Sequence, residues 1–128
     1  MKDRQMGNRV FTILLADDDA AARLYYHDEL IEEKYEILMA DNGLQVLGIL
    51  EDKKVDLLVT DIRMPDMDAL EMIPRVRKEH PYLPIIVVSI IQKAEDDLIL
   101  KNSGVKAFFS KPVQMEDLKS KIRQILKV

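Results

Sequence analysis

A short apolar run that ends in an acid and then turns at a proline constrains the fold of this chain most. Residues 57–60 read Leu-Leu-Val-Thr, Asp61 follows directly, and Pro65 lies four residues further on. An apolar run of this length that is closed by turn residues is typical of a buried strand. In open α/β sheets, ligands bind outside the carboxyl ends of the strands, so Asp61 is a candidate reactive group.

Three further apolar runs end in polar residues in the same way. They are residues 10–16, which end at Asp17, Asp18 and Asp19, residues 85–88, which end at Ser89, and residues 107–110, which end at Lys111. The carboxyl ends of parallel strands meet at one edge of a sheet, so acids, a hydroxyl and an ammonium are expected to lie together there.

Strand-length runs alternate with longer segments of helical periodicity, which is the pattern of a parallel sheet with helical crossovers. Strands are predicted at residues 10–16, 35–39, 55–60, 85–89 and 107–110. The first run is continuously apolar, as expected for a strand that is covered on both faces. The sequence therefore predicts an α/β fold with a doubly wound, five-stranded parallel sheet and five helices.

Five helices are predicted, and the fourth has the least regular pattern. Asp19 is expected to cap the first helix, in which Leu24, Leu30 and Ile31 would face the core. The third helix should start near residues 66–68 and contains Pro74, which predicts a kink or a late start. The fourth is predicted at about residues 93–102 and the last at residues 113–128.

Length and composition limit the possible classes of protein. The 128 residues fit one domain, predicted at residues 9–128 after a polar extension at residues 1–8. No apolar run reaches the roughly 20 residues that span a bilayer, and the absence of cysteine makes a cytoplasmic location the default expectation. A net charge of −4, without a basic stripe, argues against direct binding of nucleic acid.

Four motifs at strand ends give the chain a specific resemblance. They are Asp17-Asp18 after the first strand, Asp61-x-x-Met64-Pro65-x-Met67-Asp68 after the third, Ser89 after the fourth and Lys111-Pro112 after the fifth. In this order the chain resembles a response regulator receiver domain, the phosphoacceptor half of a two-component signalling pair. The resemblance covers nearly the whole chain and implies a flavodoxin-like sheet of strand order 2-1-3-4-5.

The resemblance also implies roles for the residues at the sheet edge. Asp61 would accept a phosphoryl group, while Lys111 and Ser89 would contact the phosphoryl oxygens. Several converging carboxylates repel one another unless a cation lies between them, and Mg²⁺ suits such oxygen ligands. By resemblance, Asp18 and Asp61 would bind Mg²⁺ directly, Asp17 through a water molecule and Arg63 through its backbone carbonyl. Ser89 and Phe108 would form the switch.

The partners implied by the resemblance are a sensor histidine kinase or a phosphotransfer protein, and a downstream effector or fused output domain. A homodimer could form through the surface of the fourth helix, fifth strand and fifth helix. The chain would not be an enzyme beyond catalysing its own phosphorylation and dephosphorylation. No membrane partner is expected.

Two other functions compete with the phosphoacceptor. A receiver-like interaction module that no longer uses phosphate would be expected to lose one of Asp17, Asp18, Asp61, Ser89 and Lys111, and this chain keeps all five. A phosphatase of the haloacid dehalogenase type is suggested by Asp17-x-Asp19. That family expects Thr or Val where this chain has Ala21. It also expects a second acidic pair late in the chain, at a strand end, whereas Asp96-Asp97 fall inside a predicted helix.

The chain departs from the receiver pattern at two positions. Ala69 stands where the family usually has Gly, a small change near a helix start. Ile90 follows Ser89 where Ala or Gly is usual, and its larger side chain is expected beside the phosphoryl pocket.

Overall fold

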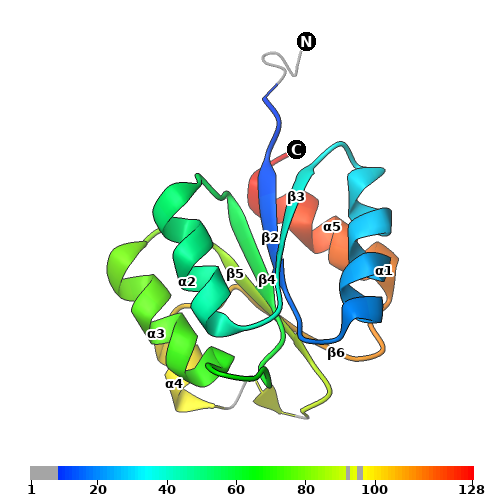
Figure 1. The fold of residues 1–128 in the computed structure, drawn as a ribbon. Helices are drawn as coiled ribbons and strands as arrows, with labels where there is room; N and C mark the ends of the chain where they lie inside the picture. Colours follow the sequence, from blue (N-terminus) through cyan, green and yellow to red (C-terminus); the bar gives the residue numbers. More distant parts are fainter. Residues whose placement is uncertain (1–8, 92, 95–96) are drawn as a thin grey trace.

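A five-stranded parallel sheet forms the centre of the molecule (Figure 1). The computed structural model describes residues 9–91, 93–94 and 97–128, so the extension predicted at residues 1–8 lies outside the described residues. The strands are β2 (Thr12–Ala16), β3 (Glu36–Ala40), β4 (Leu57–Thr60), β5 (Ile85–Ser89) and β6 (Ala107–Ser110). Their order in the sheet is β3-β2-β4-β5-β6, which is 2-1-3-4-5 in chain order, as predicted.

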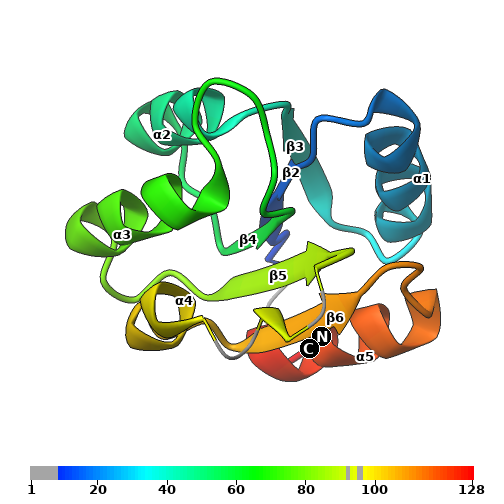
Figure 2. The ribbon, with the colours of Figure 1, turned by 90° about the horizontal axis from the view of Figure 1, so that it is seen from below.

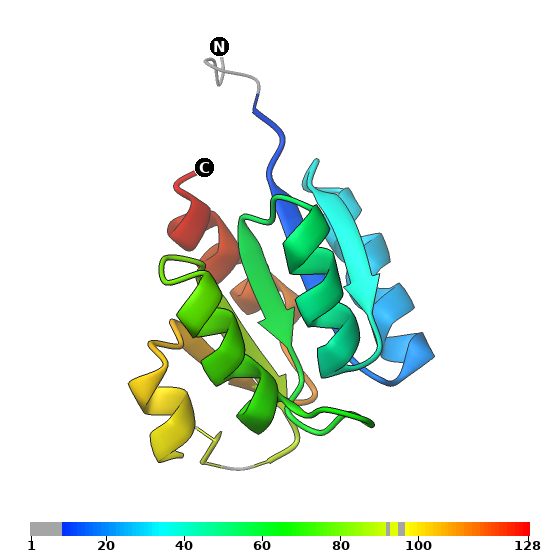
Figure 3. The same cartoon turned by 60° about the vertical axis from the view of Figure 1, so that its left-hand side comes forward.

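Helices cover both faces of this sheet. They are α1 (Ala20–Ile31), α2 (Gly43–Asp52), α3 (Ala69–Glu79), α4 (Leu98–Asn102) and α5 (Met115–Leu126). In Figure 2 the helices α1 and α5 lie on one side of the sheet, and α2, α3 and α4 lie on the other. Figure 3 shows the layer of α2, α3 and α4 in front of the sheet. The predicted doubly wound architecture is therefore confirmed.

The core consists of two separate clusters, one on each face of the sheet. Alternate residues of each strand point to opposite faces, so Leu14 and Leu58 pack with the α2–α4 layer, while Ile13 and Val59 pack with the α1–α5 layer. Every residue of β2, β4 and β5 is buried. Burial on both faces is the physical reason that these strands are continuously apolar in the sequence.

Four helices begin at a polar side chain that accepts a hydrogen bond from the first turn. The pairs are Asp19 with the amide of Ala21, Asn42 with Gln45, Asp68 with Glu71, and Asp97 with Ile99 and Leu100. The cap predicted at Asp19 is confirmed. Helix α3 begins before Pro74 and continues beyond it. The prediction that this proline delays the start of the helix is therefore wrong.

Two expectations about the helices need correction. Leu30 of α1 is buried as predicted, but Leu24 is 59 % exposed and Ile31 is 43 % exposed, because the inner face follows Tyr26 and Leu30 at a spacing of four residues.

Helix α4 begins at Leu98 and not near residue 93, in part because Lys93 has a φ of 60°, which a right-handed helix does not accommodate. Gly104 follows the end of α4 with a φ of 69°, a left-handed conformation that glycine adopts readily after a helix. Across the described residues, no helix is both long enough and apolar enough to pass through a bilayer.

Candidate functional site

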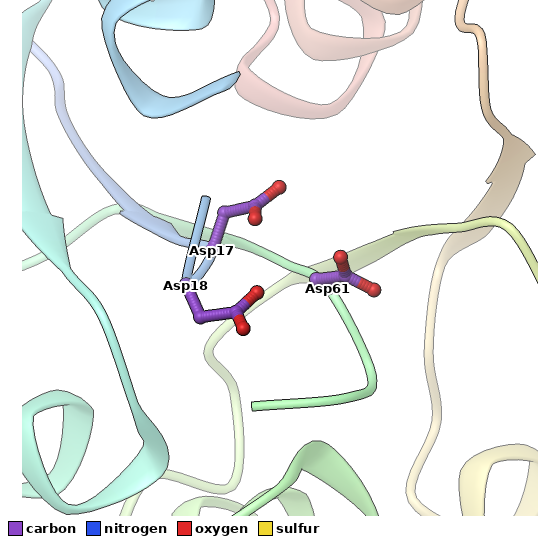
Figure 4. A group of neighbouring side chains, drawn as sticks. All are labelled: Asp17, Asp18 and Asp61. Carbon is purple, nitrogen blue, oxygen red and sulfur yellow. The ribbon is translucent and has the colours of Figure 1, made fainter. Parts of the chain in front are cut away.

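Three carboxylates meet at the carboxyl edge of the sheet. Asp17 and Asp18 follow β2, and Asp61 follows the neighbouring strand β4, with Ala16 opposite Thr60 in the parallel register. One carboxylate oxygen from each of the three acids lies within 4.8 Å of the other two (Figure 4). The structure thus brings together the acids that the sequence predicts at this edge.

Lys111 forms hydrogen bonds with two of these acids. Its Nζ donates to Asp17 Oδ2 at 2.7 Å and to Asp61 Oδ2 at 2.9 Å. Burial alone would lower the pKa of Lys111, but its hydrogen bonds to Asp17 and Asp61 outweigh burial and raise this pKa above its ordinary value. The side chain therefore stays a cation, and three carboxylates against one ammonium leave the site with a net negative charge.

Backbone groups orient the Asp61 carboxylate. Its Oδ1 accepts a hydrogen bond from the amide of Ile62 at 2.6 Å, while its own amide donates to the carbonyl of Ala16 at 2.8 Å. One oxygen of the carboxylate is thus held by the chain, and Oδ2 faces Lys111. A carboxylate fixed in this way is preorganised to react at Oδ2.

Asp17 is the most enclosed of the three acids. Its side chain is 5 % exposed, its Oδ1 accepts from the amide of Asp19 at 2.9 Å, and its Oδ2 accepts from Lys111. Both oxygens therefore already have a protein donor. This arrangement fits the role implied by the resemblance, in which Asp17 acts on a metal through a water molecule.

Ser89 ends β5 at the same edge of the sheet and is 2 % exposed. Its Oγ accepts from the amide of Ile91 at 3.1 Å, and its carbonyl accepts from the amide of Lys111 at 3.0 Å. A serine hydroxyl has one donor and two acceptor positions, so this contact leaves its proton available to a ligand. The structure thus links Ser89 to the Lys111 backbone.

Phe108 lies on β6 opposite Val87 of β5. Its half-buried ring packs against the cluster of the α2–α4 layer. The neighbouring Phe109 packs against the other cluster, as the alternation of a strand requires. Arg63 lies two residues after Asp61, and its side chain is exposed. Its backbone carbonyl can therefore contribute to the site while its charged guanidinium stays in solvent.

The ligand atoms of this cluster suit a hard divalent cation. All three side chains offer carboxylate oxygens, and Mg²⁺ prefers oxygen ligands and is usually held by one or two carboxylates with water and phosphate. Sulfur and imidazole ligands, which favour zinc or copper, do not occur in the cluster found among the described residues. The donor set therefore fits Mg²⁺.

Sequence reasoning missed how the loop after Asp61 is held. The amide of Gly43, at the start of α2, donates to the carbonyl of Met67 at 2.8 Å, and the amide of Ala69 donates to the carbonyl of Ile62 at 2.9 Å. In the sequence, Asn42-Gly43 indicates only a helix start. The link to a loop about 24 residues away has no local signal, although an Asn-Gly pair at a strand end could have prompted a search for one.

The comparisons with known proteins agree on one family. A family model described as the response regulator receiver domain matches residues 13–123. The transcriptional regulatory protein GlrR of Escherichia coli (strain K12) is 30 % identical over 113 residues, which cover 88 % of this chain and 26 % of GlrR. The response regulator MprA of Mycobacterium sp. (strain KMS) is 28 % identical, with 90 % of this chain and 50 % of MprA covered.

Solved structures show the same likeness. A CheY-like response regulator receiver domain protein from Methanospirillum hungatei JF-1 has a TM-score of 0.88 and 30 % identity, covering 93 % of this chain and 95 % of that chain. The response regulator TrrA from Thermotoga maritima, solved in complex with Mg²⁺ and BeF, has a TM-score of 0.84 and 29 % identity, covering 91 % and 99 %. The chain thus spans about a quarter to a half of the curated relatives named above, but nearly all of these solved chains.

Proposed function

The chain belongs to the response regulator receiver domain family, and from this premise we propose that Asp61 accepts a phosphoryl group in a two-component signalling system. The donor would be a sensor histidine kinase or a phosphotransfer protein. The observation that carries the proposal is the position of Lys111, whose Nζ bridges Asp17 and Asp61 at 2.7 Å and 2.9 Å. A cation beside a fixed carboxylate is the arrangement that phosphoryl transfer to that carboxylate needs.

In the proposed reaction, Asp61 Oδ2 forms a bond to phosphorus as the bond between phosphorus and the donor histidine nitrogen breaks. The electron pair of that bond stays on the imidazole. Asp61 Oδ1 remains held by the amide of Ile62, so the carboxylate keeps its orientation during the attack. Lys111 stays protonated and stabilises the negative charge on the phosphoryl oxygens.

Mg²⁺ would be held by Asp18, Asp61 and the backbone carbonyl of Arg63, with Asp17 acting through water. When bound, it supplies positive charge that offsets repulsion between the acids and the incoming phosphoryl group. The donor set of the three acids supports this assignment, as does the complex of TrrA with Mg²⁺ and BeF.

The readout of phosphorylation would begin at Ser89 and Phe108. The proton of the Ser89 hydroxyl would turn toward a phosphoryl oxygen, and Phe108 would move inward behind it. Phe108 packs against the cluster that contains Leu100 of α4, so its displacement would reach the surface of α4, β6 and α5. That surface would contact an effector or a second copy of the chain.

The relatives suggest how such a module is used. GlrR is named as a transcriptional regulatory protein and is much longer than the segment that matches this chain, so an output domain or a separate effector would receive the signal. We propose residues 9–128 as the receiver module, located in the cytoplasm. The module would catalyse only its own phosphorylation and dephosphorylation. Membership of the receiver family supports this function over a dehalogenase-type phosphatase.

Labelling with a small acyl phosphate tests the assignment. We expect intact-protein mass spectrometry to show one added phosphoryl group in the presence of Mg²⁺, and none after chelation of the metal. Asp61→Asn should abolish the addition. Asp68→Asn is a matched control, because asparagine also caps a helix and the hydrogen bond of the Asp68 side chain among the described residues is the cap of α3. Undiminished labelling of the Asp61→Asn protein would exclude Asp61 as the acceptor.

A further inference from the structure

The loop of residues 62–68 connects Asp61 to α3, and its apolar side chains anchor it. Ile62, Met64 and Met67 are 3 %, 8 % and 5 % exposed, although they lie in a loop. Asp66, between them, has a φ of 67°, a conformation that asparagine and aspartate tolerate better than most residues. The loop thus follows a fixed path close to the site.

The start of α2 fastens this loop from the outside. The first amides of a helix have no partner within the helix, and that of Gly43 donates instead to the carbonyl of Met67 at 2.8 Å. Asn42 adds a longer contact from its Nδ2 to Asp66 Oδ2 at 3.4 Å. The carbonyl of Ala40, the last residue of β3, accepts a hydrogen bond from the amide of Asp17 at 3.1 Å.

Residues 40–43 therefore touch both halves of the site. On one side they hold the backbone at Asp17, and on the other they hold the loop that starts at Asp61. The two acids are also linked directly, because the amide of Asp61 donates to the carbonyl of Ala16 and Lys111 bonds to both carboxylates. What residues 40–43 add is a link from the backbone at Asp17 to the far end of the 62–68 loop, at Met67. A change at either end of this link would alter the position of the loop relative to the carboxylates.

Gly43 is the position at which this arrangement allows no side chain. A Cβ there would lie 2.5 Å from the carbonyl oxygen of Met67 and 2.9 Å from its Cγ. The first contact is with backbone, which cannot rotate away. The φ of Gly43 lies outside the left-handed region, so the reason for a glycine is space and not backbone conformation.

We propose that Gly43 is a positioning residue for the phosphoacceptor site. By lacking a side chain, it lets the first amide of α2 hold the 62–68 loop, and so sets where this loop, with the backbone carbonyl of Arg63, lies relative to Asp17 and Asp18. The proposal rests on the proposed function, because the site that Gly43 sets is the Mg²⁺-dependent phosphoacceptor. Any side chain at residue 43 moves the loop outward and weakens the binding of Mg²⁺.

Gly43→Ala in the full chain tests this, with Gly48→Ala as the matched control. Gly48 lies in the same helix, and a Cβ there meets no atom within 4 Å apart from its chain neighbours and the backbone of its own helix. Because changing groups that orient metal ligands typically costs about 10–100-fold in metal affinity, we expect Gly43→Ala to weaken Mg²⁺ binding by about tenfold in a calorimetric titration. Saturating Mg²⁺ should restore most of the labelling rate, and Gly48→Ala should behave as the parent protein.

This pattern separates positioning from simple loss of fold, since partial unfolding would reduce labelling at every Mg²⁺ concentration. Equal Mg²⁺ affinity in the Gly43→Ala and Gly48→Ala proteins would overturn the proposal, and so would a deficit that saturating metal does not correct in a folded protein. If the parent protein takes no label while the two variants still differ in Mg²⁺ affinity, the proposed function fails and the positioning role stands.

A second measurement needs no variant and applies even if Gly43→Ala does not fold. If holding the loop favours Mg²⁺ binding, then by linkage Mg²⁺ must favour the bond from Gly43 to Met67. We expect the Gly43 amide to exchange with solvent about tenfold more slowly in saturating Mg²⁺, which corresponds to about 1.4 kcal/mol. An exchange rate that Mg²⁺ leaves unchanged would contradict the coupling.

Discussion

Ile90 follows Ser89 and is 73 % exposed, so its side chain does not turn into the core. Its β-branched side chain is stiff and stands where the family usually has Ala or Gly. Small donors must approach Asp61 from solvent, and the water that hydrolyses an aspartyl-phosphate must reach the phosphorus in line. A bulky residue over that approach should slow both reactions.

We therefore expect Ile90→Ala to speed small-donor labelling and dephosphorylation by roughly tenfold each, which is about 1.4 kcal/mol of barrier. The phosphoryl half-life, followed by intact-protein mass spectrometry, gives the comparison. Val10→Ala is a suitable control, because Val10 is another exposed β-branched residue and precedes β2 at the opposite edge of the sheet. Equal half-lives for Ile90→Ala and the parent would mean that Ile90 does not gate the site and faces a partner.

Residue types at strand ends were enough to predict which side chains meet at the site. Asp17, Asp61 and Lys111 are joined by hydrogen bonds, although 50 residues separate the last two in sequence. The role of Gly43 could not be predicted in the same way. Its requirement for space comes from the carbonyl of Met67, and a backbone group leaves no mark on the sequence pattern.

At the scale of single elements, Arg77 of α3 ties three segments together. Its Nε donates to the carbonyl of Ser103 at 2.7 Å, and its Nη1 donates to the carbonyls of His80 at 3.1 Å, Pro81 at 3.0 Å and Leu83 at 2.8 Å. One guanidinium thus anchors the end of α4 and the loop before β5 to α3. The end of α4 is fixed in this way, while its start at Leu98 carries no such anchor among the described contacts.

Hydrogen bonds to a charged group contribute about 1.5–3 kcal/mol each when partly buried, and losing them exposes carbonyls to incomplete solvation. We expect Arg77→Ala to lower the free energy of unfolding by about 2–4 kcal/mol in a urea titration. Arg75→Ala is the matched control in the same helix. Arg75 is 58 % exposed, and its one ion pair among the described residues is with Glu71, so its loss should cost less than about 0.5 kcal/mol. Similar losses in both proteins would show that Arg77 is not an anchor.

Strands were easier to predict from sequence than helix faces and helix ends. The bounds of β5 and β6 match the prediction. Strand β5 is buried on both faces and is therefore a continuous apolar run, whereas β6 lies at the edge of the sheet and is only half-buried. In α1 the exposure of Leu24 was not predicted. Leu24, Leu30 and Ile31 lie near one stripe of the helix, and this apolar pattern hid the fact that Tyr26 is the residue that faces the core with Leu30. The late start of α4 depends on the cap at Asp97 and on the φ of Lys93, which composition does not encode.

At the scale of the whole molecule, the site and the C-terminus lie at opposite edges of the sheet. The strands run toward Asp61, and the C-terminus lies at the edge where β2 starts (Figure 1). The surface of α4, β6 and α5 extends along the side of the fold between these two edges. The route through Ser89 and Phe108 predicts that a signal from the site leaves by this surface.

Hydrogen exchange with and without Mg²⁺ and beryllofluoride, a phosphoryl mimic, tests this route. We expect changes in protection to concentrate in α4, β6 and α5, and to be larger in α4, because Phe108 packs on the side of the sheet that α4 covers. Helices α1 and α2 should change less than these elements outside the immediate surroundings of the site. Changes concentrated in α1 and α2 would rule out the proposed switch, and Asp61→Asn provides the baseline without the modified acid.

The two clusters of the core share no residue among those described, because the sheet lies between them. A substitution in one layer and a substitution in the other are therefore expected to combine additively where the two residues lie more than about 7–10 Å apart and share no partner. In evolutionary terms, each layer is a separate unit of variation. The α1–α5 layer can diverge toward a new partner while the opposite layer, which holds the loop after Asp61 and the ring of Phe108, keeps its packing and hence its chemistry.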